Sequence, residues 1–147
     1  MEIRRATIHE TRYIVDQSLE VLKEATMGHV TPTPEKSLQM MSLFLSNEGY
    51  YLVAVENDVV AGWVGIGSTI DYLTNELIGV IPEIYVLPKY RKYGIAERLC
   101  EDAFRQLKEG RHDKVQLHVF AGNHAKQLYQ KLGFQEVSTL MEKKLDG

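Results

Sequence analysis

The strand, loop and helix predicted for residues 83–109 constrain the fold more than any other segment of this chain. A β-branched and aromatic run ends at Pro88, and a basic loop that ends at Gly94 follows it. Helix-period spacing of apolar residues begins at once, from Ile95 to Leu107. Such a loop directs backbone N–H groups and the positive end of a helix dipole at one point, which suits a phosphate. Gly94 has no Cβ where a ligand oxygen would come closest or where φ must be positive. The basic side chains of the loop are Lys89, Arg91 and Lys92.

The first half of the chain predicts a strand, two helices and a β-hairpin. Thr7 and Glu10 have the spacing of a capping box, and Thr33 with Pro34 repeats a helix-start signal. Asn57-Asp58 indicates a hairpin turn. The expected elements are a strand at 2–6, helices from 7 to about 25 and from 33 to about 47, and strands at 50–56 and 59–70. The residues expected to face inward from the helices are Ile14, Val15, Leu19, Leu22, Leu38, Met41 and Leu45.

The second half predicts alternating strands and helices. Pro82 lacks a backbone donor within its strand, which indicates an edge, a bulge or interrupted pairing. The expected elements are a turn at 71–75, a strand ending at 86, a helix at 94–109, a strand at 114–120, a short helix at 122–132 and a last strand at 137–145. This order predicts one α/β domain with an antiparallel front half and a βαβ crossover behind it.

Bulk properties exclude several classes of protein. A chain of 147 residues with 44% apolar residues can bury one core, and a formal charge of −3 argues against general nucleic-acid binding. The single cysteine, Cys100, excludes an intramolecular disulfide and lies on the apolar face of its helix, where we expect it to be buried. The apolar run 59–67 is too short to cross a bilayer, and we expect a cytoplasmic protein. The five histidines show no metal-binding spacing, so we expect no metal site.

Two sequence blocks resemble one known family. Residues Arg91 to Ala96 resemble the R/Q-x-x-G-x-G/A signature of the GCN5-related N-acetyltransferases (GNAT), whose loop wraps the pyrophosphate of acetyl-CoA. Residues Ala125 to Phe134 resemble the A-x-x-L-Y-x-K-x-G-F segment of the same family. The resemblance covers about the whole chain, 1–147, as a single N-acetyltransferase domain. It implies an α/β fold with a central mixed, largely antiparallel sheet of about six or seven strands, flanked by about four helices.

The resemblance also implies a donor site. It implies acetyl-CoA as the acyl donor and no metal. In the family, a splayed strand exposes backbone groups that pair with the pantetheine arm. The chain departs from the family at Asn123, which lies two residues before Ala125, whereas the family asparagine lies three before; helix capping is the other role open to Asn123. The residues expected to bind the donor are Ile84, Tyr85, Val86, Arg91, Lys92, Tyr93, Gly94, Ile95, Ala96, Asn123 and Lys126.

Two residues are the candidates for proton transfer. Glu83 lies in a strand just before the donor-facing residues, and the resemblance makes it the base that takes a proton from the amine. A solvent-facing carboxylate, or one that only binds a cationic substrate, remains an alternative. Tyr129 matches the family's general acid, which protonates the CoA sulfur; its alternative role is a packing aromatic beside Leu128 and Leu132. The oxyanion would be held by a backbone N–H of residues 84–86.

The function expected from these observations is acetyl transfer to a primary amine by direct attack in a ternary complex. A ping-pong route is disfavoured because Cys100 is expected to be buried. The alternative is a CoA-binding regulatory or sensor domain without turnover; a nucleic-acid patch at 89–92 is a weak third reading. The expected partners are a small-molecule amine or a peptide or protein amine, with no nucleic acid and no membrane, and a homodimer stays open. His29 is a weak candidate on the acceptor side.

Overall fold

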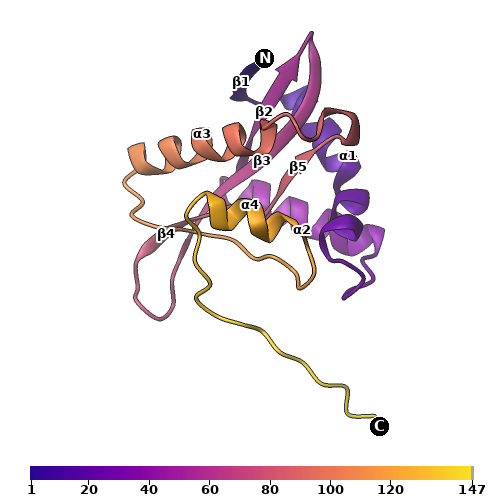
Figure 1. Cartoon of the computed structure of the whole chain (residues 1–147), viewed down its shortest axis with the longest axis vertical. Helices are drawn as coiled ribbons and strands as arrows, with labels where there is room; N and C mark the ends of the chain where they lie inside the picture. The colour runs from indigo at the N-terminus through magenta and orange to yellow at the C-terminus, as the bar shows by residue number, and fades with distance from the viewer. Residues whose placement is uncertain (147) are drawn as a thin grey trace.

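The computed structural model describes residues 1–146, which form four α-helices and a six-stranded sheet (Figure 1). The strand order is β1-β2-β3-β4-β6, and β5 pairs with β3. Neighbouring strands are antiparallel except β4 and β6, which are parallel. This confirms the predicted mixed, largely antiparallel α/β fold. The strands are β1 (Glu2–Arg5), β2 (Tyr50–Glu56), β3 (Val59–Ile70), β4 (Leu77–Val80), β5 (Ile84–Val86) and β6 (Val115–Gln116). The helices are α1 (Ile8–Ala25), α2 (Pro34–Ser46), the 3₁₀ turn η1 (Pro88–Tyr90), α3 (Ile95–Glu109) and α4 (Ala125–Lys131).

The sheet separates two apolar clusters. Successive side chains of a strand point to opposite faces, so Val53 and Trp63 pack with α1 and α2, whereas Leu52 and Val64 pack with α3. Helix α3 presents a continuous buried stripe to this second face. The buried members of that stripe are Ile95, Leu99, Cys100, Ala103 and Leu107. Burial of Cys100 confirms the sequence prediction, and it raises the pKa of the thiol to about 12.

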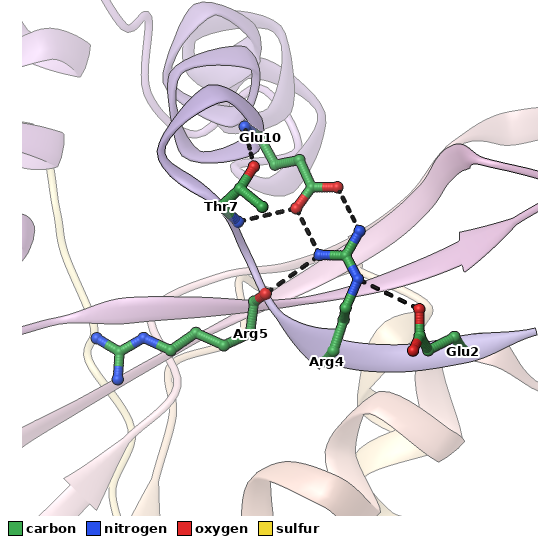
Figure 2. Close-up of polar contacts among 5 residues, drawn as sticks. All are labelled: Glu2, Arg4, Arg5, Thr7 and Glu10. Carbon is green, nitrogen blue, oxygen red and sulfur yellow. Dashed lines mark hydrogen bonds and ion pairs between the residues drawn. The ribbon is translucent and has the colours of Figure 1, made fainter.

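The start of α1 is fixed by the predicted capping box and by one arginine (Figure 2). The Glu10 N–H donates to Thr7 Oγ1 at 3.1 Å, and the Thr7 N–H donates to Glu10 Oε1 at 2.8 Å. Arg4 of β1 donates to both oxygens of Glu10, at 2.7 and 2.8 Å, so a bidentate pair joins β1 to α1. Hydrogen bonding by Arg4 lowers the pKa of Glu10 to about 2. The cap therefore also fixes the angle at which the helix leaves the sheet.

The packing between α1 and α2 corrects one prediction. Thr33 caps α2 and Pro34 begins it, as the sequence predicts, but Leu38 is 57% exposed rather than buried. Ser37 faces α1 instead, and its hydroxyl lies 2.7 Å from that of the buried Ser18. The small side chains of Ser18 and Ser37 let α1 and α2 come close. The face of α2 that contacts α1 is therefore centred on Ser37 rather than on Leu38. The apolar spacing could not show this, because serine carries no hydrophobic signal.

One extra residue between β4 and β5 interrupts the strand predicted to end at residue 86. Gly67 pairs with Val80 and Val64 pairs with Ile84, so two residues of β3 face three on the other strand. This is a β-bulge at residues 81–83, and it contains Pro82, as the missing donor of proline predicts. The hairpin turn at residues 57–58 is also confirmed, because both residues have positive φ, 50° and 63°.

Two predicted strands differ from the structure. The strand predicted at 114–120 is limited to β6, because β4, the strand with which it pairs among residues 1–146, ends at Val80. The last strand predicted at 137–145 is absent: residues 135–146 have no regular structure and are exposed. Alternating side chains show strand propensity but do not supply a partner for the backbone. The helix predicted at 122–132 begins later, at Ala125.

No helix in the part of the chain that the structure describes is both long and apolar enough to cross a membrane.

Replacing Glu10 by Gln tests the ion pair at the start of α1. Because the pKa of Glu10 is lowered from 4.5 to about 2, its contribution is complete above about pH 4.5 and is lost as the pH falls through 2. Glutamine keeps the capping acceptor, so we expect the variant to lose about 0.5–1 kcal/mol of unfolding free energy at pH 7. Urea unfolding at pH 7 and pH 3 should show the difference from the natural chain shrinking at the lower pH. Glu101→Gln, at an exposed carboxylate of α3, is the control; an equal loss at both pH values would contradict the assignment.

Candidate functional site

The sheet opens into a gap beside β5. Beyond the bulge, β5 remains paired with β3. The chain after β6 instead leaves the sheet and runs to the turn that precedes α4 (Figure 1). Within residues 1–146, the last backbone hydrogen bond between the two sides is the one that the Ile81 N–H donates to Gln116 O at 3.1 Å. One edge of β5 therefore has no neighbouring strand within residues 1–146. This is the splayed arrangement that the family resemblance implied for residues 84–86.

The open edge of β5 presents backbone groups of Ile84 and Val86. Gly65 N–H donates to Glu83 O and Leu87 N–H donates to Ala61 O, so the odd-numbered residues of this segment direct their backbone groups to β3. Because backbone groups alternate along an antiparallel strand, those of Ile84 and Val86 point to the gap. Their side chains pack on the α3 face, and Tyr85 packs against Trp63 on the other.

The loop before α3 has the open geometry that a phosphate would need. Lys92 has φ 72° and Gly94 has φ 77°, both in the left-handed region. A Cβ at Gly94 would meet no atom within 4 Å, so the glycine leaves free space in front of the helix. Gly94 is also the N-cap of α3 and supplies no side-chain acceptor to the first turn. The first backbone N–H groups, those of Ile95 and Ala96 among them, precede the helical hydrogen-bond ladder and are directed at this space. Lys92 and Tyr93 are exposed around it.

Arg91, expected to face the donor, is engaged within the protein. Its Nε donates to Val86 O at 2.7 Å, and its Nη1 lies 2.8 Å from Glu24 Oε1 at the end of α1. The guanidinium also stacks over the ring of Tyr85, 5.1 Å from its centroid. Arg91 thus joins the loop, the end of β5 and α1. Of the β5 backbone groups that point to the gap, the Val86 carbonyl is the one that accepts a hydrogen bond from Arg91.

Glu83 lies at the base of the gap on the face covered by α1 and α2. The indole N–H of Trp63 donates to its Oε2 at 2.6 Å. Burial raises the pKa of Glu83 to about 7, although the hydrogen bond from Trp63 opposes that shift. Glu83 is partly exposed as a residue, and the indole orients one oxygen of its carboxyl. Near neutral pH it exists in both protonation states, which suits a group that takes up a proton.

Tyr129 lies on α4, on the opposite face of the sheet from Glu83. Its ring is 9% exposed and meets Phe134 edge-on, and Phe134 in turn packs on Phe104 of α3. Burial raises the pKa of Tyr129 to about 12, so the phenol stays protonated at neutral pH. The packing role is therefore observed, and the role of general acid stays a prediction.

The turn before α4 is tied to α1. Asn123 Oδ1 accepts the Ala125 N–H at 2.9 Å just before α4, whose N-cap is His124, and its Nδ2 donates to Ala25 O at 3.2 Å. His29 Nε2 lies 2.9 Å from Ala121 O, and its ring stacks on Phe120. Lys126 pairs with Glu136. A donor-binding role for Asn123 and Lys126 stays a prediction, since both side chains already have partners within the chain.

Two functional candidates were not identified from the sequence. Trp63 orients Glu83, and Glu24 holds Arg91, yet neither belongs to a recognised motif. A tryptophan within an apolar strand was the only available signal for the first, and Glu24 is one of several charged residues on α1. Within residues 1–146 no three His, Cys, Asp or Glu side chains gather as a metal site would require.

Known proteins resemble the chain in family and in fold. The model of the acetyltransferase (GNAT) family matches residues 15–134. A Pyrococcus furiosus protein, provisionally described as an acetyl transferase, aligns with a TM-score of 0.82 at 24% identity, over 98% of this chain and 99% of its own. The apo aminoglycoside 6'-N-acetyltransferase AAC(6')-IG of Acinetobacter haemolyticus gives 0.72 at 22%, over 99% and 100%. A Clostridium acetobutylicum protein solved with acetyl-CoA gives 0.73 at 20%, over 98% and 96%. No curated protein sequence matches significantly. The family model covers most of the chain, including β5, the loop before α3 and α4. The chain therefore belongs to the GNAT acetyltransferase family.

Proposed function

We propose that this protein is an acetyl-CoA-dependent N-acetyltransferase that acts on a primary amine by direct attack in a ternary complex. The observation that carries the proposal is Glu83: a half-buried carboxyl with a pKa of about 7, oriented by Trp63 at the base of an open strand gap. An alkylamine with a pKa near 10 is mostly protonated at neutral pH, so the reaction needs a base of this kind.

The residues around the gap fit the acyl donor. The outward backbone groups of Ile84 and Val86 provide pairing partners for amides of an extended chain. Gly94 and the first turn of α3 provide N–H donors and free space for a diphosphate. A backbone N–H of β5 would stabilise the negative charge that develops on the thioester oxygen during attack.

Glu83 and Tyr129 then divide the proton transfers. Glu83 removes a proton from the ammonium on the side of α1 and α2, directly or through water, and Tyr129 protonates the departing sulfur from the side of α3 and α4. Their positions on opposite faces of the sheet match the two ends of one transfer reaction. Burial of Cys100, with its raised pKa, supports direct transfer over a covalent acyl-enzyme.

The acceptor is proposed to be a cationic amine, since two structural neighbours are aminoglycoside N-acetyltransferases, AAC(6')-Iy and AAC(6')-IG. A screen of polyamines, aminoglycosides and peptide amines, scored by release of free thiol from acetyl-CoA, tests the function. Turnover with at least one class is expected. If coenzyme A binds but no amine releases thiol, the alternative of a CoA-binding sensor domain is favoured.

Replacing Glu83 by Gln tests the base. Turnover of the natural chain should rise with pH through about 7, because only the ionised carboxylate accepts a proton. We expect the variant to lose about 100-fold in kcat and to lose that inflection of the pH–rate profile. Glu56→Gln, at the far end of β2, is the control and should leave both unchanged. An unchanged pH profile in the Glu83 variant would remove the proposed role.

Replacing Tyr129 by Phe tests the acid. The ring packing is retained while the proton donor is lost, so we expect kcat to fall about 10- to 100-fold with little change in the KM for acetyl-CoA. Tyr50→Phe removes a hydroxyl that donates to Gln106 while the ring stays in place, and it serves as the matched control. Retention of full kcat in the Tyr129 variant would show that its role is packing alone.

Replacing Glu24 by Gln tests whether the Arg91 contact preorganises the donor loop. Loss of the charged partner should leave the loop less ordered, and we expect coenzyme A to bind about three- to tenfold more weakly by calorimetry. Glu20→Gln, one turn earlier on α1 and paired only with Lys23, should bind like the natural chain. Unchanged affinity in the Glu24 variant would show that the contact plays no part in donor binding.

A further inference from the structure

Trp63 and Glu83 are diagonal neighbours on two paired segments of the sheet. Trp63 of β3 pairs with Tyr85 of β5, and Glu83 precedes Tyr85 by two residues. The Gly65 N–H donates to Glu83 O, so the pairing with β3 extends to Glu83. Side chains two residues apart on a strand point to the same face, where a long aromatic side chain can reach its diagonal neighbour. The indole Nε1–H thereby donates to Glu83 Oε2 at 2.6 Å.

The indole ring is fixed by its surroundings. Trp63 is fully buried in the cluster that α1 and α2 cover. Tyr13 of α1 meets the ring edge-on, with centroids 6.0 Å apart, and the Tyr85 ring lies 5.2 Å away. A buried ring packed in this way keeps one rotamer. The N–H therefore stays directed at one oxygen of Glu83.

The two oxygens of the Glu83 carboxyl differ. Within residues 1–146, Trp63 supplies the one hydrogen bond from a side chain to this carboxyl, and no buried side-chain oxygen lacks a partner. Oε1 is therefore not fully enclosed. Oε2 is fixed by the protein, whereas Oε1 remains free to bind a proton.

The contact with Trp63 favours the ionised carboxyl. An indole N–H donates and cannot accept, and its hydrogen bond is stronger to a carboxylate than to a neutral acid. Burial raises the pKa of Glu83 to about 7, and the bond from Trp63 acts in the opposite direction. Without this donor the pKa would be higher, and less carboxylate would be present at neutral pH.

Other titratable groups face this cluster from α1, β2, β5 and the loop before α3. They are Tyr13, Glu24, Tyr51, Tyr85 and Arg91. Burial raises the pKa of Tyr51 and of Tyr85, so both phenols stay uncharged near pH 7. Arg91 and Glu24 pair with each other, and α2 contributes Met41, whose sulfur accepts from Tyr51. A transition near pH 7 in this cluster is therefore assigned to Glu83.

We propose that Trp63 is a positioning residue for the base: its N–H holds Oε2 of Glu83, favours the carboxylate, and leaves Oε1 as the atom that takes the proton. A proton leaves the ammonium of the acceptor, directly or through water, and an O–H bond forms at Oε1. The electron pair of the broken N–H bond stays on nitrogen, which then attacks the thioester. The role of Glu83 as base rests on the proposed function, whereas the effect of Trp63 on its protonation can be measured without turnover.

The indole resonance gives the first test. The chain contains a single tryptophan, so its indole N–H gives one peak in a proton–nitrogen correlation spectrum. This peak should move upfield as the pH falls through about 7, because the neutral acid is the weaker acceptor. The Glu83→Gln variant should show no such transition. A peak that stays constant between about pH 5 and about pH 9 in the natural chain would overturn the proposal.

Replacing Trp63 by Phe gives the second test. The variant keeps an aromatic ring and loses the donor, so the titration midpoint of the Glu83 carboxyl carbon, followed by carbon-13 NMR, should rise by about one pH unit. Tyr13→Phe alters the same cluster and leaves the indole in place, so its midpoint should remain at about 7. Circular dichroism checks that both variants fold. An unchanged midpoint in folded Trp63→Phe would overturn the proposal, and the indole peak of the natural chain decides the matter if that variant does not fold.

Kinetics separate positioning from a merely structural role. The pH–rate inflection of Trp63→Phe should also rise by about one unit, with the KM for acetyl-CoA changed by less than about twofold. A rate that falls equally at every pH would indicate lost packing alone and would overturn the proposal. If no amine supports turnover, the proposed function fails, and the two NMR midpoints still decide whether Trp63 sets the protonation of Glu83.

Discussion

One extra residue in the segment 81–83 is the constraint on which the rest of the site depends. Up to Val80 the chain pairs with both β3 and β6. The bulge then keeps β5 on β3 while the chain after β6 departs, and a gap opens between the two sides. The same distortion turns Glu83 toward Trp63, where a 2.6 Å hydrogen bond and partial burial set its proton affinity. A single local irregularity therefore opens the gap and includes Glu83, the proposed base.

The two ends of the gap differ in the charge that they favour. The end beside the start of α3 favours a negative charge, whereas burial near Glu83 and Tyr129 favours uncharged groups. The left-handed Gly94 and the uncapped start of α3 supply partial positive charge without a side chain in the way. Deeper in, Glu83 and Tyr129 are both shifted by burial toward their protonated forms. This arrangement is compatible with a diphosphate bound beside α3 and with proton transfer near Glu83 and Tyr129. The pKa of Glu83 stays near 7, which is consistent with the proposed role as a base.

Local rules predicted much of this structure. The capping box at Thr7, the Thr33-Pro34 start and the hairpin at 57–58 depend on residues within four positions of one another, and all three are confirmed. The conformation of the loop at 91–94 also depends on residues close to one another in the sequence. The predictions that were wrong involve partners distant in sequence. Ser18 of α1 contacts Ser37 of α2, so Leu38 does not face inward, and the strand predicted at 137–145 has no neighbouring strand in the described residues. The partners of Glu83 and Arg91, Trp63 and Glu24, lie 20 and 67 positions away, so no motif could reveal them.

The contacts between the α1–α2 connection and the turn before α4 have a consequence for how such a protein can diversify. Asn123 binds the last turn of α1 and His29 binds Ala121, so the far wall of the gap is anchored to the connection that follows α1. Insertions or deletions there would therefore also move the turn on the far side of the gap. Under the proposed function, a lineage that changes the length of this connection must also compensate for the shifted far side of the gap.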